Sequence, residues 1–183
     1  MSIGGRLPME MKEALALIRE VPDFPKPGIL FLDITPALAN SEALTVIIQT
    51  LAKEIGAGEI IAGIEARGFI LGAGVAVAEN LGFVPIRKKG NLPSRTYSVQ
   101  YGLEYGVDEI EVHIDALLPG QRVVILDDVL ATGGTLRAAI ELVEKCGAIV
   151  EKIVVLIEIA GLSGRGTIEK AYPNILISAI TLI

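Results

Sequence analysis

The segment Val123–Thr135, with the sequence VVILDDVLATGGT, constrains the fold more than any other part of the chain. Its apolar start is too short for a helix and is typical of a fully buried strand in a parallel sheet. Two acids, Asp127 and Asp128, follow at the point where we expect this strand to end. A glycine-rich turn then leads into the helical pattern LRAAIELVEKCG. The segment therefore predicts a strand, a turn and a helix in series, as in an open α/β sheet.

The same segment predicts a ligand, because ligands of open α/β sheets bind outside the carboxyl ends of the strands. A glycine-rich turn before a helix presents backbone N–H groups and the positive end of the helix dipole to a phosphate. Carboxylates suit sugar hydroxyls instead, since hydroxyls can donate hydrogen bonds to them. We expect a ribose 5′-phosphate, with its ribose at Asp127 and Asp128 and its phosphate at Ala131, Thr132, Gly133, Gly134 and Thr135. An ordinary strand-to-helix connection is the alternative, because a Gly-Gly turn by itself requires no ligand.

Composition limits the class of protein. A chain of 183 residues predicts a single domain, and a hydrophobic fraction of 51% with only 4% aromatics is typical of a parallel sheet covered by helices. The sequence contains no long uncharged apolar stretch of the kind that spans a membrane, and the N-terminus lacks the pattern of a secretion signal. A lone cysteine, Cys146, fits a reducing compartment, and the net charge of −6 argues against nucleic-acid binding. We therefore expect a cytoplasmic protein with neither a membrane nor a nucleic-acid partner.

Alternating strand and helix patterns predict a central, mostly parallel sheet flanked by helices. Strands are expected at 29–32, 59–64, 83–87, 110–114, 149–159 and 175–183, and helices at 9–19, 41–55 and 68–80. Residues 88–108 are rich in glycine and lack a continuous apolar run, so we expect a long functional loop there. In the alternating run that follows, Glu111, His113 and Asp115 share one face, which we expect to be solvated.

Several motifs carry a resemblance to a known family. PDFPKPGILFLDITP, EARGF, IRKKG, LEYG and DDVLATGGT occur in the order found in the adenine-specific members of the type I phosphoribosyltransferases. The resemblance implies the type I phosphoribosyltransferase fold for a single domain over 1–183, with a small N-terminal hood at 1–35 and a flexible lid loop at 88–108. It also implies an activity: adenine and phosphoribosyl pyrophosphate give AMP and pyrophosphate, with Mg²⁺, in a homodimer. With no His/Cys cluster in the sequence, Mg²⁺ is expected to be held by substrate oxygens and water.

The resemblance also implies roles for individual residues. Arg67, Arg87 and Lys88 would bind pyrophosphate, for which the fork of an arginine side chain is suited. Glu104 and Tyr105 would be the catalytic residues of the lid, where closure could bring Glu104 to the N9 proton of the purine.

Base recognition is expected at the strand after the proline-rich segment. The ring of Phe31 would stack on adenine, and backbone atoms of Leu30 and Leu32 would read the edge of the base. Leu32 departs from the family, which usually has a polar residue there, and Asn91 replaces the usual lysine of the lid. Two alternatives remain open: a phosphoribosyltransferase for hypoxanthine, guanine or xanthine, and a non-catalytic nucleotide sensor, which would need a separate DNA-binding module.

Overall fold

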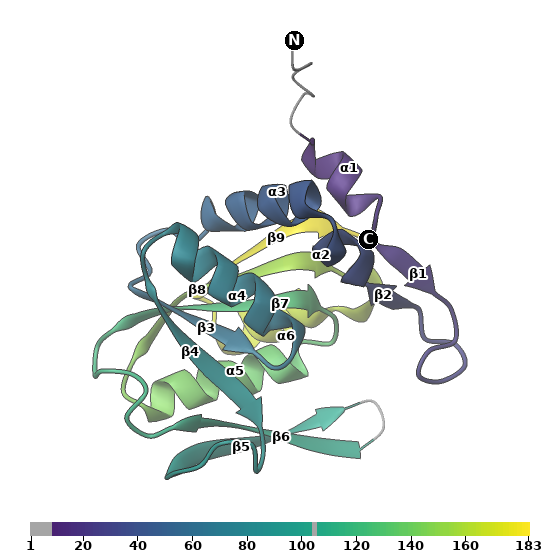
Figure 1. Cartoon of the computed structure of the whole chain (residues 1–183). Coiled ribbons are helices and arrows are strands. Elements are labelled where there is room, and N and C mark those ends of the chain that lie inside the picture. The colour runs from purple at the N-terminus through teal and green to yellow at the C-terminus, as the bar shows by residue number, and fades with distance from the viewer. Residues whose placement is uncertain (1–8, 104–105) are drawn as a thin grey trace, which may run out of the picture. The chain divides into compact units, whose positions relative to one another are not determined.

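The computed structural model describes residues 9–103 and 106–183, and the chain divides into two compact units between Thr50 and Leu51 (Figure 1). The first unit reaches further along the chain than the hood expected over 1–35. Residues Glu104 and Tyr105, expected to be catalytic, lie outside the described residues.

The first unit contains a short two-stranded antiparallel sheet and short helices. Its elements are α1 (Met11–Leu15), β1 (Arg19–Val21), β2 (Phe31–Asp33), α2 (Thr35–Ala39) and α3 (Ser41–Ala52), the last of which continues past Thr50. Asn40 caps α3, because its Oδ1 accepts hydrogen bonds of 3.0 Å from the backbone N–H groups of Glu42 and Ala43. The helix expected over 9–19 is shorter in the structure, where it spans only Met11–Leu15.

The second unit is built on a seven-stranded sheet with the order β5-β6-β4-β3-β7-β8-β9. Its strands are β3 (Ile60–Ile64), β4 (Gly82–Lys88), β5 (Thr96–Leu103), β6 (Gly106–His113), β7 (Arg122–Leu130), β8 (Ile149–Glu158) and β9 (Leu176–Leu182). Its helices are α4 (Arg67–Ala78), α5 (Gly134–Lys145) and α6 (Gly164–Ala171), with a 3₁₀ turn at Ala160–Leu162. The five neighbouring strands β4, β3, β7, β8 and β9 are parallel to one another, and β6 is antiparallel to both β4 and β5. The expected mostly parallel sheet is confirmed.

Helices cover both faces of this sheet, with α4 on one side and α5 on the other (Figure 1). This arrangement follows from right-handed crossovers. The connection through α4 moves from β3 to β4, toward one edge of the sheet, and the connection through α5 moves from β7 to β8, toward the other edge. Leu71 and Val75 of α4 are fully buried, as are Ile140 and Leu142 of α5. Among the described residues, no helix combines the length and the apolarity needed to cross a membrane.

Two sequence expectations about strands are corrected by the sheet. Residues 88–108 are not a loop throughout, because β5 and β6 form an antiparallel hairpin whose register runs from Thr96 opposite His113 to Leu103 opposite Gly106. An edge hairpin with one partly exposed face needs no continuous apolar run. The strand expected to end at Asp127 continues to Leu130, since Val129 and Leu130 still pair with β8.

Candidate active site

The turn after β7 has the backbone geometry of a phosphate-binding loop. Gly133 adopts a left-handed conformation with φ of +84°, and α5 begins at the next residue. A Cβ at Gly133 would lie 2.9 Å from the carbonyl oxygen of Gly164, so a side chain would also clash there. A cavity of about 60 Å³ opens at this turn, lined by Val129, Ala131, Thr132, Gly133, Gly134, Thr135 and Leu136. The five residues predicted to bind phosphate therefore line one small cavity at the N-terminus of a helix.

Asp127 and Asp128 form a poorly solvated acid pair beside this turn. Asp128 is only 4% exposed, and Asp127 is half-buried, with its Oδ1 accepting a 2.9 Å hydrogen bond from the N–H of Asp128. Burial raises the pKa of Asp127 well above its ordinary value, and the charge of Asp128 adds to this effect. Burial likewise raises the pKa of Asp128, although Arg67 opposes the shift. Hydroxyl donors or a cation at this position would stabilise the ionised pair.

The raised pKa of Asp127 predicts that this acid pair lowers stability at neutral pH, so Asp127→Asn is expected to raise the melting temperature of the ligand-free protein. A raised pKa means that the folded chain favours the protonated carboxyl, so stability falls as pH rises from the unfolded value of 3.8 toward the folded value. Asparagine removes that penalty and can still accept the hydrogen bond from Asp128.

Calorimetry at neutral pH and below pH 3.8 checks this prediction. The increase in melting temperature should be present at neutral pH. It should disappear in acid, where the side chain at position 127 is uncharged in both the unchanged protein and the variant. The exposed Asp115→Asn is the matched control and should leave the melting temperature unchanged. A lower melting temperature for Asp127→Asn at neutral pH would contradict the argument.

Arg67 is the first residue of α4, and its side chain reaches the acid pair. Its Nε lies 2.8 Å from Oδ2 of Asp128. The close approach of α4 to β7 depends on Gly68, because a Cβ there would lie 2.8 Å from the carbonyl oxygen of Leu126 and 2.9 Å from Oδ1 of Asp127. The structure therefore brings Arg67 and the ribose-binding candidates together at one edge of the sheet.

Arg87 lies near the end of β4, at the same edge of the sheet, and is held by Glu65. Its Nε lies 3.3 Å from Oε2 of Glu65, an oxygen that also accepts a 2.9 Å hydrogen bond from the N–H of Lys88. Burial acts to raise the pKa of Glu65, but hydrogen bonds from Lys88, Asn91 and Arg87 outweigh it and lower the pKa below its usual value. Glu65 is thus an ionised partner that orients Arg87.

The side chain of Lys88 has a different partner from that of Arg87. Its Nζ lies 3.2 Å from Oδ2 of Asp108 on β6, and the same oxygen accepts a 3.2 Å hydrogen bond from the hydroxyl of Tyr101. Tyr101 also contacts Thr135 of the turn after β7, and burial raises the pKa of the Tyr101 hydroxyl. The hairpin therefore borders this turn, and a cavity of about 370 Å³ between them is lined by Tyr101 and Gly102 of β5 and by Thr132, Gly134 and Arg137.

The residues predicted to bind the base belong to the first unit. The ring of Phe31 packs edge-to-face on Phe24, with centroids 5.1 Å apart and an angle of 69° between the planes. The side chain of Leu30 is exposed and that of Leu32 is 4% exposed. Asp33 then fixes the start of α2, since its Oδ1 accepts hydrogen bonds from the backbone N–H and the hydroxyl of Thr35. These contacts make Phe31 part of a small aromatic pair.

Sequence reasoning missed Glu65 as the partner of Arg87, although Glu65 lies in the quoted EARGF motif beside Arg67. Asn91 was noted only as a departure from the family, and its contact with Glu65 was missed: its side-chain amide lies 3.3 Å from both carboxylate oxygens of Glu65. A carboxylate at the end of a strand, two positions before an arginine, was the available signal for Glu65. Within residues 9–103 and 106–183, no group of three or more His, Cys, Asp or Glu side chains is placed to hold a metal ion.

A parallel α/β sheet with a glycine turn at a helix N-terminus and an acid pair beside that turn is the arrangement expected of a phosphoribosyl-binding protein. In agreement, the sequence model of the phosphoribosyl transferase domain family matches residues 35–178. The chain is 57% identical over 161 residues to the adenine phosphoribosyltransferase of a Nocardioides species, a match that covers 85% of this chain and 87% of that one. The chain therefore belongs to the adenine phosphoribosyltransferase family.

Solved structures agree with this assignment. The adenine phosphoribosyltransferase of Thermoanaerobacter pseudethanolicus superposes with a TM-score of 0.90 at 46% identity, covering 95% of this chain and all of that one. The enzyme of Saccharomyces cerevisiae, solved with adenine and an imino-altritol bisphosphate, gives a TM-score of 0.85 at 33% identity, covering 93% of this chain and 98% of that one. The expected type I phosphoribosyltransferase fold is thus confirmed.

Proposed function

We propose that this protein transfers the 5-phosphoribosyl group of phosphoribosyl pyrophosphate to adenine, giving AMP and pyrophosphate in purine salvage. The observation that carries the proposal is the turn after β7, where Gly133 shapes a small cavity at the start of α5 next to the acids Asp127 and Asp128. Membership of the adenine phosphoribosyltransferase family supports the choice of base.

The phosphoribosyl group would be held at two points. The turn Ala131–Thr135 would bind the 5′-phosphate through backbone N–H groups and the positive end of α5. Asp127 and Asp128 would orient the ribose by accepting hydrogen bonds from its hydroxyls. Because the phosphate does not react, its binding energy serves to position the anomeric carbon, where an oxocarbenium-like transition state is expected.

The pyrophosphate leaving group would be met by Arg67, Arg87 and Lys88. Each of these side chains has an acidic partner in the structure, so each is oriented at the strand ends before substrate arrives. Preorganised cations stabilise the negative charge that develops on a leaving group without reorganising during the reaction.

Mg²⁺ would be bound mainly by substrate oxygens and water, as is common for this ion. The acid pair fits a nearby cation, because a positive charge would offset both the burial of Asp127 and its repulsion from Asp128, which together raise its pKa. When bound, Mg²⁺ would supply charge neutralisation at the pyrophosphate. The protein residues would orient the ribose and the leaving group around it.

Base recognition and proton transfer are the remaining parts of the proposal. Phe31 would stack on adenine, with backbone atoms of Leu30 and Leu32 reading its edge, and the buried side chain of Leu32 supports a backbone role for that residue. Glu104 and Tyr105 would be the catalytic residues, with Glu104 accepting or relaying the N9 proton. We also propose that the protein acts in the cytoplasm as a homodimer, without a nucleic-acid or membrane partner.

Adenine should be preferred over hypoxanthine and guanine by at least about 100-fold in kcat/KM. A site that binds adenine offers a hydrogen-bond acceptor to its amine. Hypoxanthine has a carbonyl oxygen at that position, so two acceptors would face each other, and such mismatches are strongly rejected. The protein is incubated with Mg²⁺, phosphoribosyl pyrophosphate and each purine base, and the nucleotide and pyrophosphate are quantified. Comparable kcat/KM for hypoxanthine would refute the adenine assignment, and binding without any nucleotide formed would indicate a sensor.

A further inference from the structure

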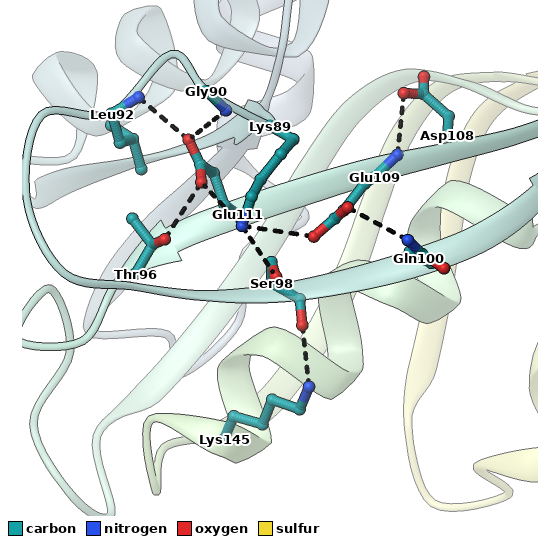
Figure 2. Close-up of polar contacts among 10 residues, drawn as sticks. All are labelled: Lys89, Gly90, Leu92, Thr96, Ser98, Gln100, Asp108, Glu109, Glu111 and Lys145. Atoms are coloured by element: carbon teal, nitrogen blue, oxygen red, sulfur yellow. Dashed lines mark hydrogen bonds and ion pairs between the residues drawn. The ribbon is translucent and has the colours of Figure 1, made fainter.

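Glu111 is a buried carboxylate with a full set of partners (Figure 2), and it lies opposite Arg87 in the pairing of β4 with β6. The residue lies on β6 and is 2% exposed, which corrects the expectation of a solvated face. Its Oε1 accepts 3.0 Å hydrogen bonds from the backbone N–H groups of Gly90 and Leu92. Its Oε2 accepts a 3.1 Å hydrogen bond from the hydroxyl of Thr96 and lies 3.8 Å from Nζ of Lys89. A carboxylate can be buried only where hydrogen-bond donors and a cation satisfy it, so these four partners fix the position of the side chain.

The backbone that Glu111 holds is the tight turn Lys88–Asn91, directly after β4. The N–H of Asn91 donates a 3.2 Å hydrogen bond to the carbonyl oxygen of Lys88, and Gly90 has a φ of +87°. A positive φ at the third residue is the signature of a type II turn. Gly90 and Leu92, whose N–H groups donate to Glu111, flank Asn91 in the chain. The carboxylate therefore fixes the backbone on both sides of Asn91.

Asn91 contacts the proposed pyrophosphate-binding arginine from this turn. Its carbonyl oxygen accepts a 2.8 Å hydrogen bond from Nη1 of Arg87, and its side-chain amide lies 3.3 Å from the carboxylate of Glu65. Glu65 in turn accepts from Nε of Arg87. The guanidinium of Arg87 is therefore held on one edge by Glu65 and on another by a carbonyl whose position depends on Glu111.

We propose that Glu111 is a positioning residue for phosphoribosyl transfer: it clamps the turn Lys88–Asn91 so that Asn91 and Glu65 hold Arg87 in its pyrophosphate-binding orientation. The inference rests on the proposed role of Arg87. Glu111 also ties this turn to the hairpin, because Thr96 is the first residue of β5 and Lys89 bridges to Ser98 and Glu109 (Figure 2). The turn and the base of the hairpin are thus anchored by one carboxylate.

The test compares variants of Glu111 by steady-state kinetics. Glu111→Ala leaves the N–H groups of Gly90 and Leu92 without an acceptor, and we expect KM for phosphoribosyl pyrophosphate to rise about 10- to 100-fold, as displacement of a binding group does. KM for adenine should stay within about twofold, since the effect is confined to pyrophosphate binding. Glu111→Gln should recover most of the loss, because its amide oxygen can accept from both N–H groups.

Glu109→Gln is the matched control. The side chain of this residue on β6 contacts Lys89 and Gln100, whereas the N–H groups of Gly90 and Leu92 are accepted by Glu111 (Figure 2). The substitution keeps the backbone of Glu109 and should leave both KM values unchanged. If Glu111→Ala does not fold, as judged by circular dichroism, Glu111→Asp replaces it. Its shorter side chain keeps the charge but withdraws from the turn, so it should raise the same KM. An unchanged KM for phosphoribosyl pyrophosphate in folded Glu111→Ala or Glu111→Asp would overturn the inference.

Arg87→Ala and the double variant with Glu111→Ala separate this inference from the function on which it rests. If Glu111 acts through Arg87, the double variant should have the same KM for phosphoribosyl pyrophosphate as Arg87→Ala alone. Multiplying effects in the double variant would overturn the positioning role while leaving Arg87 in place. Unchanged kinetics in Arg87→Ala would instead refute the pyrophosphate role of Arg87, and with it the premise for Glu111.

Discussion

Glu104→Gln should retain the fold and the affinity for phosphoribosyl pyrophosphate yet lose about 10²–10⁴-fold in kcat, the range typical of general acid–base catalysis. Glutamine can hydrogen-bond to the purine but cannot take its N9 proton. A residue that only positioned the base would give a smaller loss, mainly in KM for adenine. The size and the kind of the defect thus distinguish the two roles.

Single-turnover kinetics is the measurement for this variant. If the proposed lid closes over the substrates, its motion can limit the steady-state rate and conceal a chemical defect, whereas a single turnover with enzyme in excess reports the chemical step. The rate of AMP formation in that regime should fall by the same factor as kcat or by more. An undiminished single-turnover rate would remove the catalytic role assigned to Glu104.

The segment from β7 to α5 shows how far local sequence determines the structure. A buried apolar strand, a positive-φ glycine and an amphipathic helix are all specified by neighbouring residues, and all are present in the expected order. The alternation of strands and helices was equally informative for the parallel part of the sheet. Strand ends were less accurate, because the end of β7 is decided by pairing of Val129 and Leu130 with β8.

A strand was expected at residues 110–114 of β6, but β5 and its pairing with β6 were not predicted, for a physical reason. Its strands are antiparallel and partly exposed, so their residues alternate without a continuous apolar run. Which face of such a strand is buried depends on what packs against it. Glu111 was therefore assigned to solvent, although the turn at Gly90 and Leu92 supplies donors that cover it.

For the candidate site, the sequence identified the charged residues but not their partners. Arg67 and Arg87 were expected to face an anion, and in the structure they contact Asp128 and Glu65, respectively. These pairs join residues that are distant in the chain and meet only because β3, β4 and β7 are parallel neighbours whose carboxyl ends share one edge. Such contacts follow from strand order, which local patterns do not specify.

Gly133→Val should weaken binding of phosphoribosyl pyrophosphate by about 100-fold, because one or two backbone hydrogen bonds to a charged phosphate are worth roughly 1.5–3 kcal/mol each. Valine is strained at a φ of +84°, and its Cβ would lie 2.9 Å from the carbonyl oxygen of Gly164. The turn would have to move, and its N–H groups would no longer converge on the phosphate. Gly120→Val is the matched control, since Gly120 also has a positive φ, of +77°, but lies in open space.

A second variant tests the site without changing the turn. Asp128→Asn keeps the shape of the side chain but removes the charged acceptor for the ribose hydroxyls and the partner of Arg67. Its affinity for phosphoribosyl pyrophosphate should fall about 10- to 100-fold, in line with the loss of a charged hydrogen bond of roughly 1.5–3 kcal/mol. Circular dichroism should be unchanged.

Calorimetric titration of phosphoribosyl pyrophosphate with Mg²⁺ into the unchanged protein, Gly133→Val, Asp128→Asn and Gly120→Val tests most directly whether the turn after β7 binds the phosphoribosyl group. We expect binding to the unchanged protein and to Gly120→Val with similar affinity, and much weaker binding to the other two variants while their folds persist. Wild-type affinity in folded Gly133→Val and Asp128→Asn would show that this turn is only a connection between a strand and a helix.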